Sequence, residues 1–233
     1  MERKSIFILL LISVLMVSLI GISEALLLSV SDYTGYRTAD PGDPHYGIFA
    51  TDGWGDAAGG YFRISWVIDY NMSYPKPYRY EYTFDIPDFG GGLSHFIIEV
   101  SEDSTRDNFW PDPGDDLTKH KEQQGNPGLP SHLFGIKTNT SGQTGIQTYT
   151  IWSDKAPMWG DLYAKDGTLA GTGIDIYAYN LGFGVEPTLG DSPYNSWIAV
   201  PDTETMVPEP ATLILMILGI LGLAFVGFKR KSK

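Results

Sequence analysis

Residues 61–84, YFRISWVIDYNMSYPKPYRYEYTF, contain the pattern that decides the fold. In residues 61–70 large apolar side chains recur at every second position, and residues 78–84 repeat the alternation with aromatic rings opposed to Arg, Glu and Thr. Successive side chains of a β-strand point to opposite faces, so both segments are predicted as strands with one buried face. The proline-containing residues 71–77 predict the turn between them. The expected buried face holds Phe62, Ile64, Trp66, Ile68, Tyr70, Tyr78, Tyr80, Tyr82 and Phe84.

Shorter patterns of the same kind extend this reading along the chain. They predict strands at residues 95–101, 145–152, 161–164 and 173–180, with a tight turn at Asp166-Gly167. Residues 185–208 are expected to form an edge strand that runs into an extended linker. No segment between the chain termini carries a long helical period. The sequence therefore predicts an all-β fold, an antiparallel β-sandwich or jelly roll over residues 26–200.

One stretch of the central region departs from this pattern. Residues 103–130 are polar, acidic and rich in proline and glycine, and they show no periodicity. This composition is typical of irregular connections, so we predict a long surface loop. A short helix is expected within it at residues 117–123.

The amino terminus has the composition of an export signal. Arg3 and Lys4 precede the apolar residues 6–22, and Ser23-Glu24-Ala25 has the small-x-small form that signal peptidase accepts. We predict that residues 1–25 are a signal peptide cleaved after Ala25. The apolar run is longer than in most signal peptides, which leaves an uncleaved anchor as the alternative. Both readings predict an exported chain.

The carboxyl terminus predicts a membrane-spanning helix. Residues 211–228 contain no charged side chain, and at about 1.5 Å per residue a helix of this length spans a hydrocarbon core of about 30 Å. A buried core helix is the alternative, but it would require a polar face. Basic residues beside a span mark its cytoplasmic end. The basic residues that follow are Lys229, Arg230, Lys231 and Lys233.

The same terminus resembles a known sorting signal. Val207-Pro208-Glu209-Pro210, followed by an apolar helix and a basic cluster, is similar to the PEP-CTERM signal of exported bacterial proteins. The resemblance implies that an exosortase in the membrane recognises Pro208, Glu209 and Pro210, removes the helix and passes the protein to the cell envelope or extracellular matrix. Because proline prevents a helix from extending upstream, the motif is expected to stay accessible. Residues 201–233 are thus predicted to be a linker and sorting signal, anchored in the membrane at least transiently.

A second resemblance covers three segments of the central region. Residues 157–167 (PMWGDLYAKDG), 178–184 (AYNLGFG) and 200–203 (VPDT) are similar to a series found in PEP-CTERM proteins. This similarity supports the same assignment. It implies no activity.

Charge and cysteine content exclude several classes of function. Removing residues 1–25 and 209–233 takes away 6 of 16 Lys and Arg but only 3 of 28 Asp and Glu, which leaves a net charge of −15. Such a domain repels phosphates, so nucleic acid and anionic lipid are not expected as its partners, whereas cations and neutral sugars remain possible. The chain has no cysteine, so it contains neither a disulfide nor a thiol nucleophile.

The sequence predicts a non-catalytic protein of the cell surface or extracellular matrix. It contains no nucleophile elbow, zinc motif, phosphate-binding loop or dinucleotide fingerprint. One alternative is a module that binds matrix polysaccharide through aromatic rings on loops; a less favoured one is a glycan-active enzyme with a carboxylate pair. The candidate sugar-stacking residues are Trp54, Trp110 and Trp159, whereas Trp66 and Trp152 lie in strand patterns and are predicted to be core.

Calcium is the one metal that the sequence leaves open. Asp112, Asp115 and Asp116 lie around a proline and a glycine that favour a tight bend, and carboxylates are ligands that calcium prefers. We expect no other cofactor.

Overall fold

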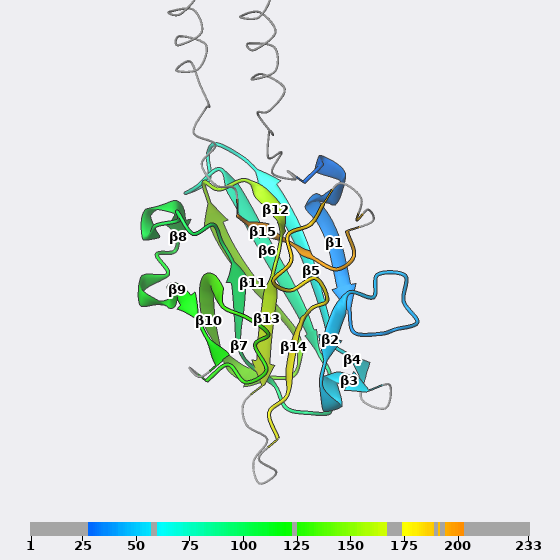
Figure 1. Cartoon of the computed structure of the whole chain (residues 1–233). Helices are drawn as coiled ribbons and strands as arrows, with labels where there is room; N and C mark the ends of the chain where they lie inside the picture. Colours follow the sequence, from blue (N-terminus) through cyan, green and yellow to red (C-terminus); the bar gives the residue numbers. More distant parts are fainter. Residues whose placement is uncertain are drawn as a thin grey trace, which may run out of the picture.

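The protein folds into two antiparallel β-sheets that pack face to face, as the computed structural model shows (Figure 1). The structure describes residues 28–56, 60–122, 125–166, 174–188, 191 and 194–202. The five-stranded sheet has the order β1 (Thr34–Thr38), β5 (Arg63–Tyr70), β6 (Tyr78–Ile86), β11 (Gly145–Ser153) and β8 (Phe109–Trp110). The six-stranded sheet has the order β2 (Ile48–Ala50), β14 (Tyr177–Asn180), β13 (Leu162–Asp166), β7 (Leu93–Glu99), β10 (Leu133–Gln143) and β9 (Leu117–His120). The all-β prediction is confirmed.

Shorter elements complete the described chain. Two-stranded ladders join β12 (Pro157–Gly160) to β15 (Ile198–Pro201) and β3 (Gly55–Asp56) to β4 (Gly60–Tyr61). The helical turns are η1 (Val30–Tyr33), η2 (Asp52–Trp54), η3 (Arg106–Asn108) and η4 (Gly114–Asp116). Among the described residues, no helix is long and apolar enough to span a membrane. The predicted signal peptide, residues 1–25, and the predicted span, residues 211–228, lie outside the described residues.

The alternation in residues 61–84 places the core as predicted, with one exception. Phe62, Ile64, Trp66 and Ile68 are buried, and so are the alternate residues of β6 from Tyr80 to Ile86. Tyr70 is 57% exposed because it is the last residue of β5 and lies at the end of the sheet. The core lies between the sheets, where the rings of Phe84 on β6 and Phe96 on β7 are 4.6 Å apart.

The chain passes repeatedly between the two large sheets. β6 pairs with β11 in the five-stranded sheet. The strand that follows β6, β7, pairs in the six-stranded sheet with β10, the strand that precedes β11. Local sequence patterns predicted β7, β11, β13 and β14, but not β1, β2, β9, β10 or β12. The expected edge strand in residues 185–208 is β15, which is buried along its whole length and pairs with β12.

The prediction for residues 103–130 is wrong in two respects. Residues 117–120 form the strand β9 and not part of a helix, because they pair with β10 at the edge of the six-stranded sheet. The segment that follows is not a simple surface loop either: Asn126 and Leu129 are buried as it folds over the outer face of this sheet. There the Asn126 side chain lies 3.0 Å from His95 Nε2 and accepts a hydrogen bond from Lys137 Nζ at 3.2 Å.

The described chain begins and ends at the same end of the sandwich. The Leu28 N–H donates to the Pro157 carbonyl at 3.3 Å, and Pro157 is the register partner of Pro201. Adjacent strands lie about 4.8 Å apart, so residues 28 and 201 are only about two strand spacings apart. We call this end the terminal pole.

Candidate functional site

Two of the three segments of the second resemblance, residues 157–167 and 178–184, meet in one buried hydrogen-bond network. Asp161 lies between β12 and β13, and its carboxylate accepts hydrogen bonds from Asn180 Nδ2 at 2.8 Å and from the Gly184 N–H at 2.6 Å. Asn180 Oδ1 accepts from the Leu162 N–H at 2.7 Å, and Asn180 Nδ2 also donates to the Ser196 carbonyl. Glu99 on β7 accepts from the Asp161 N–H at 2.6 Å. We call these side chains and their backbone partners the Asp161 network.

Two glycines of the same segments allow close packing. A Cβ at Gly182 would overlap the ring of Trp197, and a Cβ at Gly160 would overlap Val200. Residues 157–160 also pair directly with residues 198–201. Residues 157–167, 178–184 and 200–203 therefore pack against one another, which gives these segments a structural role.

The Asp161 network brings together two carboxyl groups with raised pKa values. Burial, together with the charges of Asp161 and Asp202, raises the pKa of Glu99 to about 9. Burial likewise raises the pKa of Asp161 to about 6, against the lowering effect of its hydrogen bonds from Asn180 and Gly184. A pair with separated pKa values is what acid-base catalysis requires. However, Asp161 is buried with both carboxylate oxygens hydrogen-bonded inside the fold, which favours a structural role.

Two of the three candidate sugar-stacking tryptophans are part of the core. Trp54 is fully buried, and its Nε1 donates to the Gly91 carbonyl at 3.1 Å. Trp159 is buried as well, 6.1 Å edge-on from Trp66 and stacked 5.6 Å from Tyr194. Neither ring presents a face to solvent, so the ligand role considered for them is corrected to a packing role.

Trp159 and Trp66 also hold a buried cation. The Arg37 guanidinium lies 5.0 Å from the Trp66 ring and 5.4 Å from the Trp159 ring. It donates to the carbonyls of Tyr36 and Tyr194, and burial lowers its pKa to about 10, so Arg37 is still protonated at neutral pH. Cation–π contact compensates part of the cost of burying this charge.

Trp110 is the candidate tryptophan that reaches the surface. Its side chain is 49% exposed and meets the Trp152 ring edge-on at 4.9 Å. Trp152 was predicted to be core, but the neighbouring positions Ile151 and Ser153 face inward and Trp152 lies half-buried on the outer face of the five-stranded sheet. The two tryptophans are register partners at the junction of β8 and β11.

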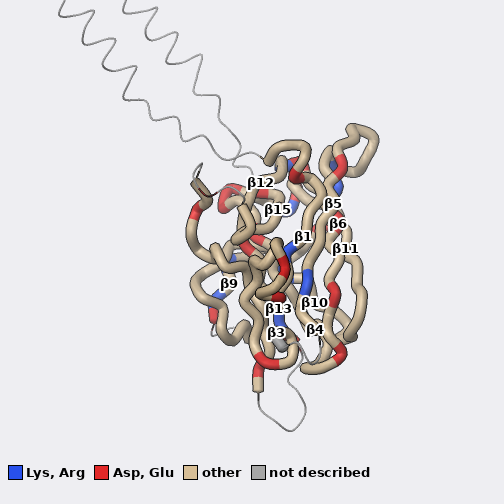
Figure 2. The backbone as a smooth tube through the Cα atoms, turned by 90° about the vertical axis from the view of Figure 1, so that its right-hand side faces the viewer, with Lys and Arg blue, Asp and Glu red and all other residues tan. Residues whose placement is uncertain are grey.

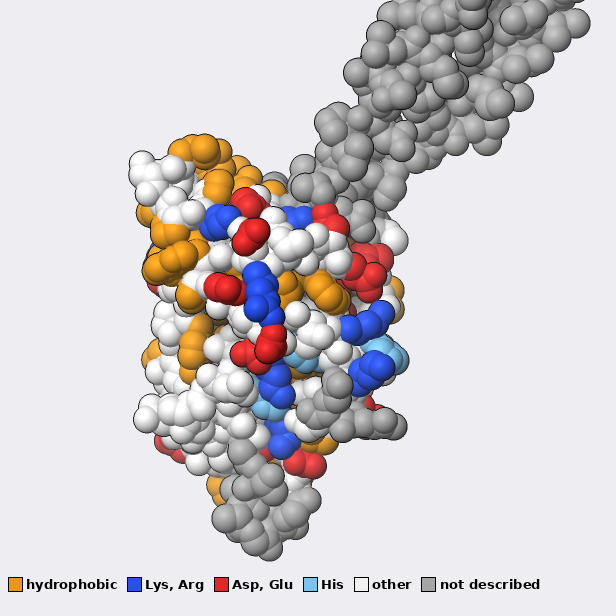
Figure 3. All heavy atoms as spheres, turned by 90° about the vertical axis from the view of Figure 1, so that its left-hand side faces the viewer, with side chains coloured by type: hydrophobic (Ala, Val, Ile, Leu, Met, Phe, Trp, Pro, Cys, Tyr) orange, Lys and Arg blue, Asp and Glu red, His pale blue; other side chains and the backbone are white. Residues whose placement is uncertain are grey.

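On the same outer face of the five-stranded sheet, charged side chains lie next to Trp152. Arg79 on β6 is the register partner of Trp152 and forms ion pairs with Asp69, at 2.9 Å, and with Glu81. We call Trp110, Trp152, Arg79, Asp69 and Glu81 the outer tryptophan face. Figure 3 shows charged and hydrophobic side chains intermingled on the side of the molecule that carries β8. The exposed Trp110 ring beside these charged groups suits a sugar ring, which offers apolar faces and hydroxyl edges.

The predicted calcium residues lie in and beside η4. Asp112 Oδ1 accepts from the Gly114 N–H at 2.8 Å, and Asp115, fully exposed, forms an ion pair with Arg106. In the described part of the chain, no group of three or more His, Cys, Asp or Glu is arranged to hold a metal ion. Calcium binding by Asp112, Asp115 and Asp116 stays a prediction.

Comparison with known proteins concerns the carboxyl terminus. No curated protein and no solved structure matches the chain. Residues 207–231 match the family model described as the PEP-CTERM protein-sorting motif. The sorting residues Pro208, Glu209 and Pro210, which lie outside the described residues, fall within the matched segment. The chain is therefore a protein that carries the PEP-CTERM protein-sorting motif at its carboxyl end.

Proposed function

We propose that the protein is exported, processed by an exosortase at its PEP-CTERM motif and deposited at the cell surface or in the extracellular matrix, where it acts without catalysis. The match of residues 207–231 to the sorting motif carries this proposal. Signal peptidase and the exosortase are its processing partners. Before processing, residues 211–228 anchor it in the membrane with the carboxyl terminus in the cytoplasm.

The fold is compatible with this route. The described chain leaves the sandwich at the terminal pole, so an anchor following residue 202 would not have to cross the domain. The carboxyl groups of Glu99 and Asp161, with pKa values of about 9 and about 6, are engaged in hydrogen bonds within the fold. Both observations support a surface domain in which the buried carboxyl groups Glu99 and Asp161 serve stability.

Fractionation of a host that contains an exosortase tests the export step. We expect the mature domain in the envelope or the medium and its amino terminus at residue 26. A matched chain that lacks residues 2–25 is expected to stay in the cytoplasm. Recovery of the complete chain from the cytoplasm would contradict the proposal.

A second candidate function is the binding of matrix polysaccharide by the outer tryptophan face. The exposed Trp110 ring, its contact with Trp152 and the adjacent ion-paired Arg79 favour it. Trp54 and Trp159 do not contribute a stacking surface. This candidate differs from the first in requiring a ligand on the domain itself.

A glycan array with the fragment of residues 26–207 tests the second candidate. Trp110→Ala is expected to reduce retention at least tenfold without changing the melting temperature. Phe89→Ala removes an aromatic ring that is also exposed but lies in the β6–β7 connection, and it should leave retention unchanged. Equal retention by the two variants, or no retention by the wild-type fragment, would refute glycan binding by this face.

A further inference from the structure

The loop between β5 and β6 has a composition that differs from the rest of the domain. Residues 70–78, YNMSYPKPY, contain three tyrosines, a methionine and two prolines, and their only charged residue is Lys76. A domain with a net charge of −15 thus has a segment without any carboxylate. In Figure 2 this loop is the upper right projection, and its tip carries no acidic residue.

The apolar side chains of this loop are exposed. Met72 is 73% exposed, and the Tyr70 hydroxyl donates to its sulfur at 3.1 Å. Tyr70 also packs edge-on against Tyr78 at 4.9 Å, which holds its ring in place at the end of β5. On the neighbouring η1, Val30 is 80% exposed. Figure 3 shows hydrophobic side chains gathered at the upper left, over this end of the sandwich.

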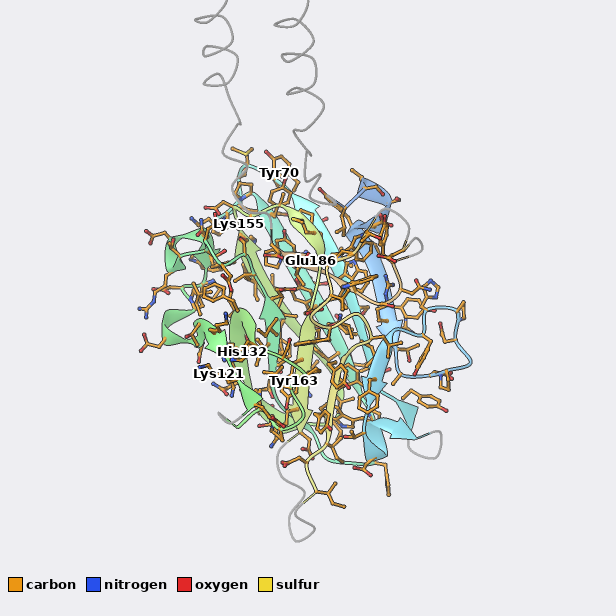
Figure 4. All side chains as sticks on the ribbon, viewed as in Figure 1. Tyr70, Lys121, His132, Lys155, Tyr163 and Glu186 are labelled. Carbon is orange, nitrogen blue, oxygen red and sulfur yellow. The ribbon has the colours of Figure 1, made fainter. Side chains whose placement is uncertain are left out.

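Strand register places this apolar surface at the terminal pole. β1 begins at Thr34, opposite Val67, so η1 before β1 and the loop after β5 lie at the same end. Tyr78 at the start of β6 is the partner of Ser153, shortly before β12 begins at Pro157. Pro157 contacts both Leu28 and Pro201, as described above. Figure 4 shows the labelled Tyr70 side chain at this end of the molecule.

Chain length then sets how far this pole can lie from the membrane. Residues 203–210 connect the last described residue to the apolar segment that begins at Ala211. Even when fully extended, the nine residue steps from Asp202 to Ala211 span at most about 32 Å. Tyrosine, with an apolar ring and a polar hydroxyl, is favoured at membrane–water interfaces. Lys76 forms an ion pair with Asp154 at 3.5 Å, so the tyrosines and Met72 carry the argument for membrane contact.

We propose that Val30, Tyr70, Met72 and the rest of the β5–β6 loop form a membrane-contact surface that lies in the headgroup region while the carboxyl-terminal anchor is in place. This inference rests on the proposed function, because it requires the anchor. It also refines the prediction from net charge: the domain as a whole repels anionic lipid, but the β5–β6 loop itself contains no carboxylate. Of the carboxylates near it, Asp154 is paired with Lys76 and Asp32 lies on η1. The contact would hold the domain in a fixed orientation beside its own sorting motif.

The absence of cysteine makes a direct test possible. The full chain with Met72→Cys, labelled with an environment-sensitive fluorophore, is reconstituted into vesicles of phosphatidylethanolamine and phosphatidylglycerol that contain a lipid-attached quencher. The matched control is Ile146→Cys, since Ile146 is similarly exposed but begins β11 at the opposite end of the sandwich. We expect a blue-shifted emission at position 72 and quenching several-fold larger than at position 146.

A second variant guards against an effect of the label itself. With the fluorophore at Val30→Cys, the added substitution Met72→Asp should reduce quenching, because it places a carboxylate in the contact surface. Equal quenching at positions 72 and 146 in protein that floats with the vesicles would overturn the membrane contact alone. A blue shift at position 72 without lipid quenching would also overturn it, since the label would then contact protein. Failure of the chain to float would contradict the anchor and, with it, the proposed function.

Discussion

Substitution of Asn180 is the strongest structural test of the Asp161 network. Asn180 is fully buried and makes three hydrogen bonds, to Asp161, Leu162 and Ser196. Asn180→Ala removes all three and leaves the Leu162 N–H, the Ser196 carbonyl and one Asp161 oxygen without these partners. An unsatisfied buried polar group costs about 1–3 kcal/mol. The expected loss in the free energy of unfolding is therefore about 4 kcal/mol.

Urea unfolding of the fragment of residues 26–207, followed by tryptophan fluorescence, measures this loss. With an m-value of about 2 kcal/mol per molar, typical of a domain of this size, the midpoint should fall by about 2 M. Asn139→Ala is the control, because Asn139 is exposed on β10 and its removal should change stability by less than about 0.5 kcal/mol.

Asn180→Asp separates hydrogen bonding from shape. It keeps the size and the acceptor for the Leu162 N–H, but it places a second carboxyl beside Asp161. Its stability should therefore recover as pH falls and one carboxyl becomes protonated. If Asn180→Ala moved the urea midpoint no further than Asn139→Ala, the reasoning about this network would be refuted.

Three further predictions follow from the charges. Because the folded-state pKa of Glu99 is raised, its stabilising contribution is complete below about pH 4 and is lost as pH rises towards 9. Between pH 6.5 and 8.5 the free energy of unfolding of the wild-type fragment, measured by urea titration, should fall by about 2 kcal/mol more than that of Glu99→Gln. Equal losses in the two proteins would contradict this. Burial lowers the pKa of His95 to about 4, so stability should fall as pH drops from 6.5 towards 4, and His95→Gln, with no group to protonate, should weaken that dependence; an unchanged acid limb would show that His95 is not responsible. The melting temperature should rise in millimolar calcium beyond the effect of sodium chloride at equal ionic strength, and Asp115→Asn should remove the difference; coinciding curves would make η4 an ordinary acidic surface.

Sequence patterns predicted the strands that carry their own periodicity. β5 and β6 were predictable because each buries alternate large side chains, from Phe62 and Tyr80 onwards. β9 was not, since its only fully buried residue is His120 and its strand conformation depends on pairing with β10. Local composition does not report on such long-range pairing.

Long-range pairing also decided where the candidate site residues lie, and local sequence patterns could not predict it. Glycine and proline around Trp159 predicted a loop, but pairing of β12 with β15 places the ring in the core. The alternation around Trp152 predicted a strand correctly, but not which face of the strand is buried. Ile151 and the small Ser153 face inward, and hydrophobicity alone would have chosen Trp152 as the buried residue. The hydrogen bonds of Asp161 join segments that are separated in sequence, so no local pattern predicted them.

The mass and location of a Glu209→Ala variant test the central claim most directly. In a host that contains an exosortase, the wild-type chain should lose its carboxyl-terminal segment and reach the envelope or matrix at reduced mass. The Glu209→Ala chain should be exported but keep residues 211–233 and stay in the membrane fraction. If the two chains had the same mass and the same distribution, the motif at residues 207–231 would not direct sorting, and the account would be contradicted.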